Sequence, residues 1–120
     1  MIIKLFDSEL KVMEVIWDNG ATPAKQIAEI LNENIGWNKN TTYTVIKKCI
    51  EKNAIKREEP NFTCHALVTK AQVRGTELDE LVDKLFDGST ELLFASLVER
   101  KKLPDGMIDK LKVIVGGSDQ

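Results

Sequence analysis

The sequence predicts a mostly helical protein with one small β-hairpin, in which three helices and the hairpin come first and a helical tail follows. Apolar residues recur at intervals of three and four in separate stretches that end at glycine or proline. Only residues 54–68 change to a period of about two. The chain has 120 residues, 42% of them hydrophobic, which is enough for one packed domain with an appendage.

The first predicted helix begins near Asp7 or Ser8, because either side chain can cap a helix N-terminus. Its apolar positions lie three, three and one residues apart, so they share one face. These positions are Leu10, Met13, Ile16 and Trp17, and we assign Trp17 to the core. Asn19-Gly20 ends the helix, since glycine tolerates the left-handed conformation found there.

A second helix opens at Thr22-Pro23, where threonine would supply the capping oxygen and proline would occupy the first helical position. Its inner face is Ala24, Ile27, Ala28 and Leu31. The segment from Asn32 to Gly36 ends it.

The third predicted helix spans about residues 38–53 and is capped by Asn38 or Asn40. Val45 with Cys49 and Ile46 with Ile50 form two apolar pairs four residues apart, which points them inward. We expect four side chains to face outward, namely Lys39, Thr42, Tyr43 and Lys47. Asn53 is suited to a left-handed helix terminus.

A hairpin follows, with strands at 54–58 and 62–68 and a turn at Glu59-Pro60-Asn61. Three helices and a hairpin in this order are typical of a winged helix-turn-helix, which places its third helix in the major groove of DNA. The hairpin, or wing, would lie along the neighbouring DNA backbone.

The charge distribution supports nucleic-acid binding although the whole chain carries a net charge of −2. Residues 39–57 contain six lysines and arginines against Glu51 alone, a local net charge of +5. Phosphate binding depends on this local field, because salt screens charges beyond about 8–10 Å. The predicted DNA-contacting residues are Lys39, Asn40, Thr41, Thr42, Tyr43, Thr44, Lys47, Lys48, Lys56 and Arg57.

We expect different roles within this set. Thr42, Tyr43, Thr44 and Lys47 would meet base edges or nearby phosphates, and Asn40 would contact adenine or cap the helix. Lysine and arginine side chains elsewhere in the set would neutralise the DNA backbone, namely Lys39, Lys48, Lys56 and Arg57.

The tail is predicted to hold one helix over about 70–86, a second after a Ser89 cap, and a third after Pro104-Asp105-Gly106. Short helices with wide apolar faces are marginal alone, so they must pack on the first part or on a second copy. We predict a DNA-binding domain at 1–69 and a dimerisation domain at 70–120. The predicted dimer contacts are Leu78, Leu81, Val82, Leu85, Phe86, Leu92, Leu93, Leu97, Ile108, Leu111, Ile114 and Val115.

The residue inventory argues against an enzyme, a cofactor or a metal site. His65 is the only histidine, and its neighbour Cys64 would point to the opposite face of the strand. One histidine and two cysteines cannot supply a closed zinc site without carboxylates, and no CxxC spacing occurs. We interpret Cys49 and Cys64 as small apolar residues. No apolar run approaches the roughly 18–20 residues needed to span a membrane, and we expect a cytoplasmic protein.

Three stretches give the chain a resemblance to the penicillinase repressor (BlaI/MecI/CopY) family. They are SELKVMEVIWDNG, TPAKQIAEIL and NKNTTYTVIKKCIEKNAIKRE. The resemblance runs almost end to end and implies a dimeric winged-helix repressor of palindromic operators, commonly with TACA and TGTA half-sites. Members of the family control β-lactam resistance or copper homeostasis.

The chain departs from the family pattern at three places. Tyr43 stands where β-lactam-responsive members have arginine, and no cysteine follows Cys64, unlike the cysteine-rich end of copper-responsive members. The bond that a regulatory protease cuts in β-lactam-responsive members corresponds to Ser96-Leu97 here, with different residues on both sides.

Two other functions fit the same fold class. A winged helix can serve as a protein-interaction module that never binds DNA. A ligand-binding regulator would need a pocket in the tail. The charge on the third helix and wing favours DNA binding over the protein-interaction module.

Overall fold

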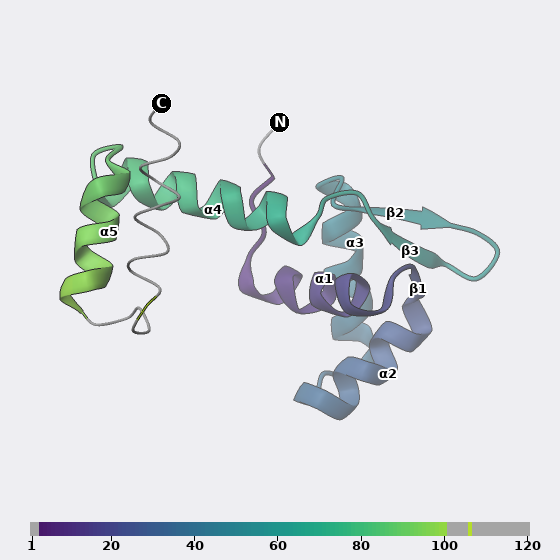
Figure 1. Ribbon diagram of the computed structural model, residues 1–120. Coiled ribbons are helices and arrows are strands. Elements are labelled where there is room, and N and C mark those ends of the chain that lie inside the picture. Colours follow the sequence, from purple (N-terminus) through teal and green to yellow (C-terminus); the bar gives the residue numbers. More distant parts are fainter. Residues whose placement is uncertain (1–2, 101–105, 107–120) are drawn as a thin grey trace. The chain divides into compact units, whose positions relative to one another are not determined.

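The computed structural model describes residues 3–100 and Gly106. Eight elements follow one another (Figure 1): α1 (Asp7–Asn19), β1 (Thr22–Pro23), α2 (Ala24–Ile35), α3 (Lys39–Glu51), β2 (Ile55–Glu58), β3 (Thr63–Ala66), α4 (Lys70–Leu85) and α5 (Thr90–Glu99). The chain divides into two compact units, Met1–Glu77 and Leu78–Gln120, so α4 contributes to both. The predicted fold class, mostly helical with a small antiparallel sheet, is confirmed.

The sheet of the first unit has three strands, whereas the sequence predicted two. Its order is β1-β3-β2, with Thr22 opposite Cys64 and Ile55 opposite Ala66. The prediction that Thr22 caps α2 is wrong, because Pro23 is the N-cap residue and its neighbour has joined the strand ladder. The Thr22 hydroxyl donates instead to the carbonyl of Gly20 at 2.7 Å.

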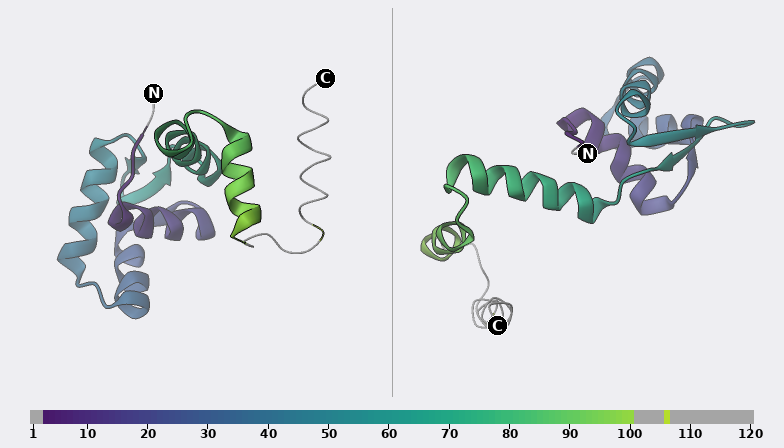
Figure 2. Two further views of the ribbon diagram at one scale, coloured as in Figure 1. Left: turned by 90° about the vertical axis from the view of Figure 1, so that its left-hand side faces the viewer. Right: turned by 90° about the horizontal axis from the view of Figure 1, so that it is seen from above.

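The core of the first unit lies among α1, α2, α3 and the sheet. In this unit α1 packs on α2 and α3, and α2 packs on α3 (Figures 1 and 2). The predicted inner face of α2 is confirmed, since its four apolar residues are all buried. Val73 joins the same core cluster from the first half of α4.

In α1 the buried face is rotated from the predicted one. Leu10 and Trp17 are only half-buried, and the buried set is Glu9, Val12, Met13, Val15 and Ile16. The indole nitrogen of Trp17 reaches the edge of the core, where it donates to the carbonyl of Val68 at 2.9 Å. A buried indole N–H needs an acceptor, and the Val68 carbonyl at the edge of the core supplies one for Trp17.

The residues at the helix ends agree with the predicted caps at α3 but not at α1. Asn38, rather than Asn40, caps α3, since its Oδ1 accepts from the backbone N–H of Thr41 at 2.8 Å. Asn53 adopts a φ of 64° after α3, as predicted. Neither Asp7 nor Ser8 caps α1: Phe6 is the N-cap residue, and its backbone N–H donates to the Glu9 carboxylate at 2.7 Å.

The second unit contains the end of α4 and α5, both close to their predicted bounds. Asp87 and Gly88 have positive φ and separate the helices, and the Ser89 hydroxyl caps α5 by accepting from the N–H of Leu92 at 3.2 Å. Leu78, Leu81, Leu85 and Leu92 are exposed in the single chain. The third predicted tail helix, with Ile108, Leu111, Ile114 and Val115, lies outside the described residues. None of the helices in the described part is long and apolar enough to cross a membrane.

Candidate nucleic-acid interface

One face of α3 is exposed and polar. Asn40, Thr41, Lys47 and Lys48 each lie three or four residues from Thr44 and share this face with it, while Lys39 is exposed at the start of the helix. The opposite face of α3 is buried in the core through Val45, Ile46 and Cys49. Packing therefore holds the helix in one rotational setting and presents the polar face to solvent.

Thr42 does not belong to this face. The expectation that it points outward is wrong, because its side chain is 0% exposed. Thr42, Val45, Ile46 and Cys49 have the spacing of one inward stripe, and the threonine methyl group completes that stripe. The hydroxyl is buried without a hydrogen-bond partner, so Thr42 is removed from the candidate contact set.

Tyr43 is half-buried and lies at the side of the exposed face, against the wing. Its ring meets the ring of Phe62 edge-on, with centroids 5.9 Å apart and an interplanar angle of 76°. The Nζ of Lys39 lies 5.7 Å from the centroid of the tyrosine ring. Tyr43 therefore makes packing contacts inside the protein as well as facing solvent.

The wing exposes Lys56 and Arg57 on β2, as the sequence predicted. The Nε of Arg57 donates to Oε1 of Glu59 at 2.6 Å, and its Cζ lies 3.7 Å from the centroid of the Phe62 ring. His65, opposite Lys56 in the ladder, lies 3.2 Å from a carboxylate oxygen of Glu58. Acidic side chains thus share the wing with the basic ones.

Lys52 belongs to the basic stretch at 39–57, but a carboxylate neutralises its charge. Its Nζ lies 2.6 Å from Oε1 of Glu9, a side chain only 1% exposed. Two of the six basic residues at 39–57, Lys52 and Arg57, are therefore paired with carboxylates. The net charge of +5 counted over residues 39–57 therefore overestimates the positive charge at the surface, because Glu9 and Glu59, which pair with Lys52 and Arg57, lie outside that stretch.

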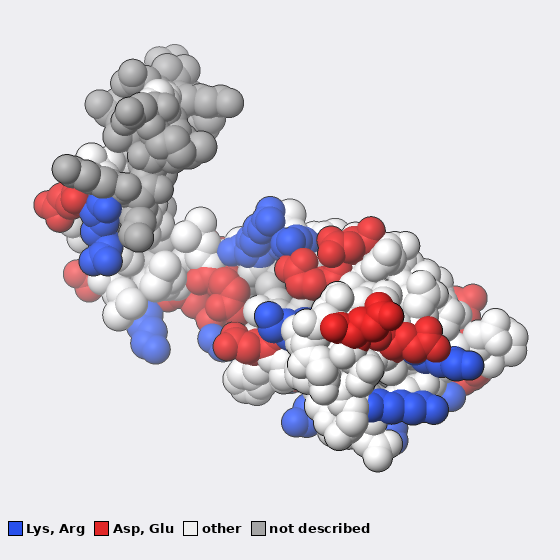
Figure 3. All heavy atoms as spheres, turned by 90° about the horizontal axis from the view of Figure 1, so that it is seen from below, with Lys and Arg blue, Asp and Glu red and all other residues white. Residues whose placement is uncertain are grey.

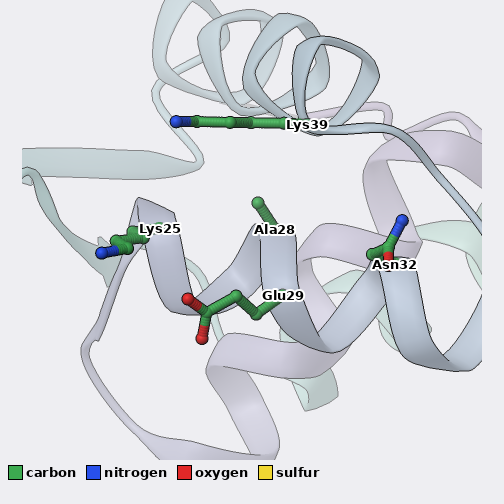
Figure 4. Close-up of a pocket in the computed structure, with 5 residues that line it drawn as sticks. All are labelled: Lys25, Ala28, Glu29, Asn32 and Lys39. Atoms are coloured by element: carbon green, nitrogen blue, oxygen red, sulfur yellow. The ribbon is translucent and has the colours of Figure 1, made fainter.

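Sequence reasoning missed Lys25, an exposed lysine near the start of α2 that lines the same pocket as Lys39 of α3. A shallow pocket of about 230 Å³ lies between α2 and α3, lined by Lys25, Ala28, Glu29, Asn32 and Lys39. Figure 4 shows Lys39 extending across from the α2 residues, with the amines of both lysines toward the same end. The first helix of a helix-turn-helix crosses the DNA backbone, so the position of Lys25 one residue after the Thr-Pro-Ala start was the available signal.

Basic and acidic side chains are mixed on one face of the molecule. On the face drawn in Figure 3, basic and acidic side chains are interspersed over the described residues. The exposed side of α3, by contrast, carries Lys47 and Lys48 with Glu51 at its end. The candidate interface is therefore a local surface on which polar and basic side chains of α3 predominate.

Comparison with known proteins identifies relatives of this chain. The model of the penicillinase repressor family matches residues 5–116. The chain belongs to the penicillinase repressor family. It is also similar to the solution structure of the DNA binding domain of the repressor BlaI, with 23% identity over 60% of this chain and 90% of that chain, at a TM-score of 0.55. That likeness confirms the winged-helix fold of the first unit. Curated proteins gave no significant match.

Penicillinase repressors are regulators rather than enzymes, and the chemistry of the two thiols agrees with that. Burial raises the pKa of Cys49 to about 12, with a smaller contribution from the nearby Glu9 carboxylate, and burial raises the pKa of Cys64 to about 11. A nucleophilic cysteine needs a lowered pKa and access to solvent. Both side chains instead lie in the core of the repressor's first unit.

Ser96-Leu97, the bond that corresponds to the cleavage site of β-lactam-responsive family members, lies within α5. Ser96 and Leu97 are both half-buried in that helix, which runs from Thr90 to Glu99. A protease binds an extended peptide, so cutting this bond would require α5 to unwind locally.

Proposed function

We propose that the protein is a homodimeric transcriptional repressor that binds a palindromic operator through α3 and the wing. The single observation that carries this proposal is the exposed polar face of α3, held in one orientation by the buried opposite face of the same helix. A helix presented in this way can enter the major groove and bring its N-terminal side chains to the base edges.

The contacts divide by chemistry. Asn40, Thr41 and Thr44 near the start of α3 can hydrogen-bond base edges, and threonine methyl groups can contact thymine. Lys47 belongs with this base-proximal group, while Lys39, Lys48, Lys56 and Arg57 would neutralise phosphates. Tyr43 stays in the interface at its edge, and Lys25 adds a phosphate contact from α2.

Dimerisation is supported by leucines that the single chain leaves exposed. In the described part of the tail, Leu78, Leu81, Leu85 and Leu92 are each at least 40% exposed. We propose that residues 70–120 bury these side chains, together with Phe86, Leu93, Leu97 and the residues predicted after Gly106, against a second copy. Val82, a predicted dimer contact, is instead already buried in the single chain and drops out of this surface. DNA contacts would come from residues 1–69, and recognition helices of a dimer would sit roughly 34 Å apart, one turn of DNA.

Repression would follow from occupying the operator and blocking polymerase in the cytoplasm. Operators with TACA and TGTA half-sites are the first candidates, given the family. A regulatory protease that cut Ser96-Leu97, inside the dimerising tail, would lower operator affinity.

Salt dependence tests DNA binding directly. Fluorescence anisotropy with an operator selected from random duplexes should give a linear fall of log affinity with log salt. Lys47→Gln with Lys48→Gln should reduce the slope by about 1 through Lys48, and by about 2 where Lys47 also meets a phosphate, since each lost phosphate contact reduces it by about 1. Lys84→Gln, an exposed lysine of α4, is the matched control and should leave the slope unchanged.

The outcome also separates the alternatives. No retardation of any duplex at micromolar protein and low salt would favour a winged-helix protein-interaction module. Binding with an unchanged slope in the double lysine variant would contradict the assignment of α3 as the DNA-contacting helix.

A further inference from the structure

Phe62 lies where three elements of the first unit meet. Its carbonyl accepts from the backbone N–H of Ala24 at 2.9 Å, which ties it to the start of α2. Its half-buried ring packs on the core and contacts side chains of α3 and β2. Its φ of 49° sets the direction in which the ring leaves the turn between β2 and β3.

The ring holds Arg57 in a defined place. The guanidinium carbon lies 3.7 Å from the ring centroid, which is the geometry of a cation–π contact. Glu59 engages the same guanidinium at its Nε. Without these contacts, an arginine on an exposed strand would sample many rotamers. It would then lose that side-chain entropy on binding a phosphate, which would weaken binding.

The ring also contacts the recognition helix. Tyr43 of α3 meets Phe62 edge-on, and Lys39 lies over the tyrosine ring. A continuous series of contacts therefore runs from the start of α3 through Tyr43 and Phe62 to Arg57 on the wing. Aromatic pairs of this geometry contribute beyond the area that they bury.

We propose that Phe62 is a positioning residue that fixes Arg57 relative to α3, so that helix and wing meet DNA as one preorganised surface. The proposal rests on the proposed DNA-binding function. It assigns Tyr43 mainly to packing against the wing rather than to reading a base. Loss of the Phe62 ring then weakens DNA binding through Arg57, although Phe62 itself needs no contact with DNA.

The first test uses the full chain without DNA. A proton above an aromatic ring is shifted upfield, so the side-chain signals of Arg57 should be displaced from their usual positions in NMR spectra. Phe62→Leu should return them to usual values, and Phe62→Tyr should retain the displacement. Arg57 signals that are the same in the wild type and in Phe62→Leu would overturn the proposal.

The second test is a double-mutant cycle on operator affinity. Phe62→Leu should weaken binding about three- to tenfold in the wild-type background and by less than twofold in the Arg57→Gln background. The matched control cycle uses Lys47→Gln, on the exposed face of α3, where the loss from Phe62→Leu should be undiminished. Equal losses in both backgrounds would overturn the positioning role.

A further pair of variants guards against a folding defect. Phe62→Tyr should keep operator affinity within about twofold, and Tyr43→Leu, which removes the second ring, should show the same coupling to Arg57→Gln. A wild-type chain that binds no DNA overturns the proposed function. A chain that binds DNA but is indifferent to Phe62→Leu and Tyr43→Leu overturns only the positioning role.

Discussion

The ammonium nitrogen of Lys52, just after α3, lies 2.6 Å from Oε1 of Glu9 in α1. The same carboxylate oxygen accepts from the backbone N–H of Phe6, and the lysine also donates to the carbonyl of Lys4 at 2.9 Å. The Lys52 ammonium lies over the Phe6 ring, 4.1 Å from its centroid. These contacts join the start of α1 to the end of the proposed recognition helix.

Lys52→Met should destabilise the protein, because it leaves the Glu9 carboxylate buried without its cation. Removing one partner of a fully buried pair costs about 3–5 kcal/mol, and the partly exposed lysine lowers our expectation to about 2–3 kcal/mol. Urea unfolding at neutral pH measures this. Lys48→Met, on the exposed face of α3, is the control and should change the unfolding free energy by less than about 0.5 kcal/mol. Equal effects of the two substitutions would show that the Glu9 pair contributes nothing.

Thr42 and Thr44 provide a matched pair on the same helix. Thr42→Val keeps the buried shape and removes a hydroxyl that has no partner, so the unfolding midpoint should rise or stay the same and operator affinity should not change. Thr44 is exposed, and Thr44→Val should weaken operator binding with little effect on stability. Thermal melts and anisotropy separate the two effects. Loss of affinity in Thr42→Val at unchanged stability would return that residue to the DNA interface.

The buried thiols predict how stability depends on alkaline pH. An unfolded cysteine loses its proton near pH 8.5, whereas folding holds the pKa of Cys49 at about 12 and that of Cys64 at about 11. The unfolded state therefore releases protons first, and stability present below about pH 8.5 should be lost as pH rises toward 11. We expect a loss of roughly 1–2 kcal/mol per thiol by pH 10 in urea unfolding.

The matched control for this effect is the variant with both Cys49→Ala and Cys64→Ala. It should be less stable at pH 7 because of the cavities that it leaves, yet its stability should fall less between pH 8 and 10. In the folded wild type, neither thiol should react with a thiol reagent at pH 8. Rapid labelling of the native chain, or the same pH dependence in both proteins, would contradict the burial of these side chains.

The exposed leucines of the tail predict the oligomeric state. Leu81→Asp with Leu85→Asp should convert a dimer to a monomer, because a carboxylate in an apolar interface loses its hydration without gaining a partner. Sedimentation equilibrium measures the change. Leu67→Asp is the control, because Leu67 is a similarly exposed leucine of the first unit and should not alter the mass. A wild-type chain that sediments as a monomer would contradict the proposed dimer itself.

Much of the fold could be predicted from local signals. The bounds of α4 and α5, the inner face of α2, the hairpin and the Ser89 cap depend on residues within a few positions of one another. The misplacement of Thr42 had a different origin, because its spacing from Val45 and Cys49 was already that of the buried face. Its residue type suggested a polar role, and the helical period was the better guide.

The amino-acid sequence by itself determined where the helices and the two hairpin strands form, which side of α3 carries lysine, and the family to which the chain belongs, because periodicity, caps and motifs are local properties. Only the tertiary structure decided that Thr22 extends the sheet, that Glu9 neutralises Lys52, and that Phe62 joins Tyr43 to Arg57. Glu9 and Lys52 are 43 residues apart, and their pairing has no pattern along the chain. Such contacts arise when packed helices bring distant side chains together, and they determine which charges remain available at the surface.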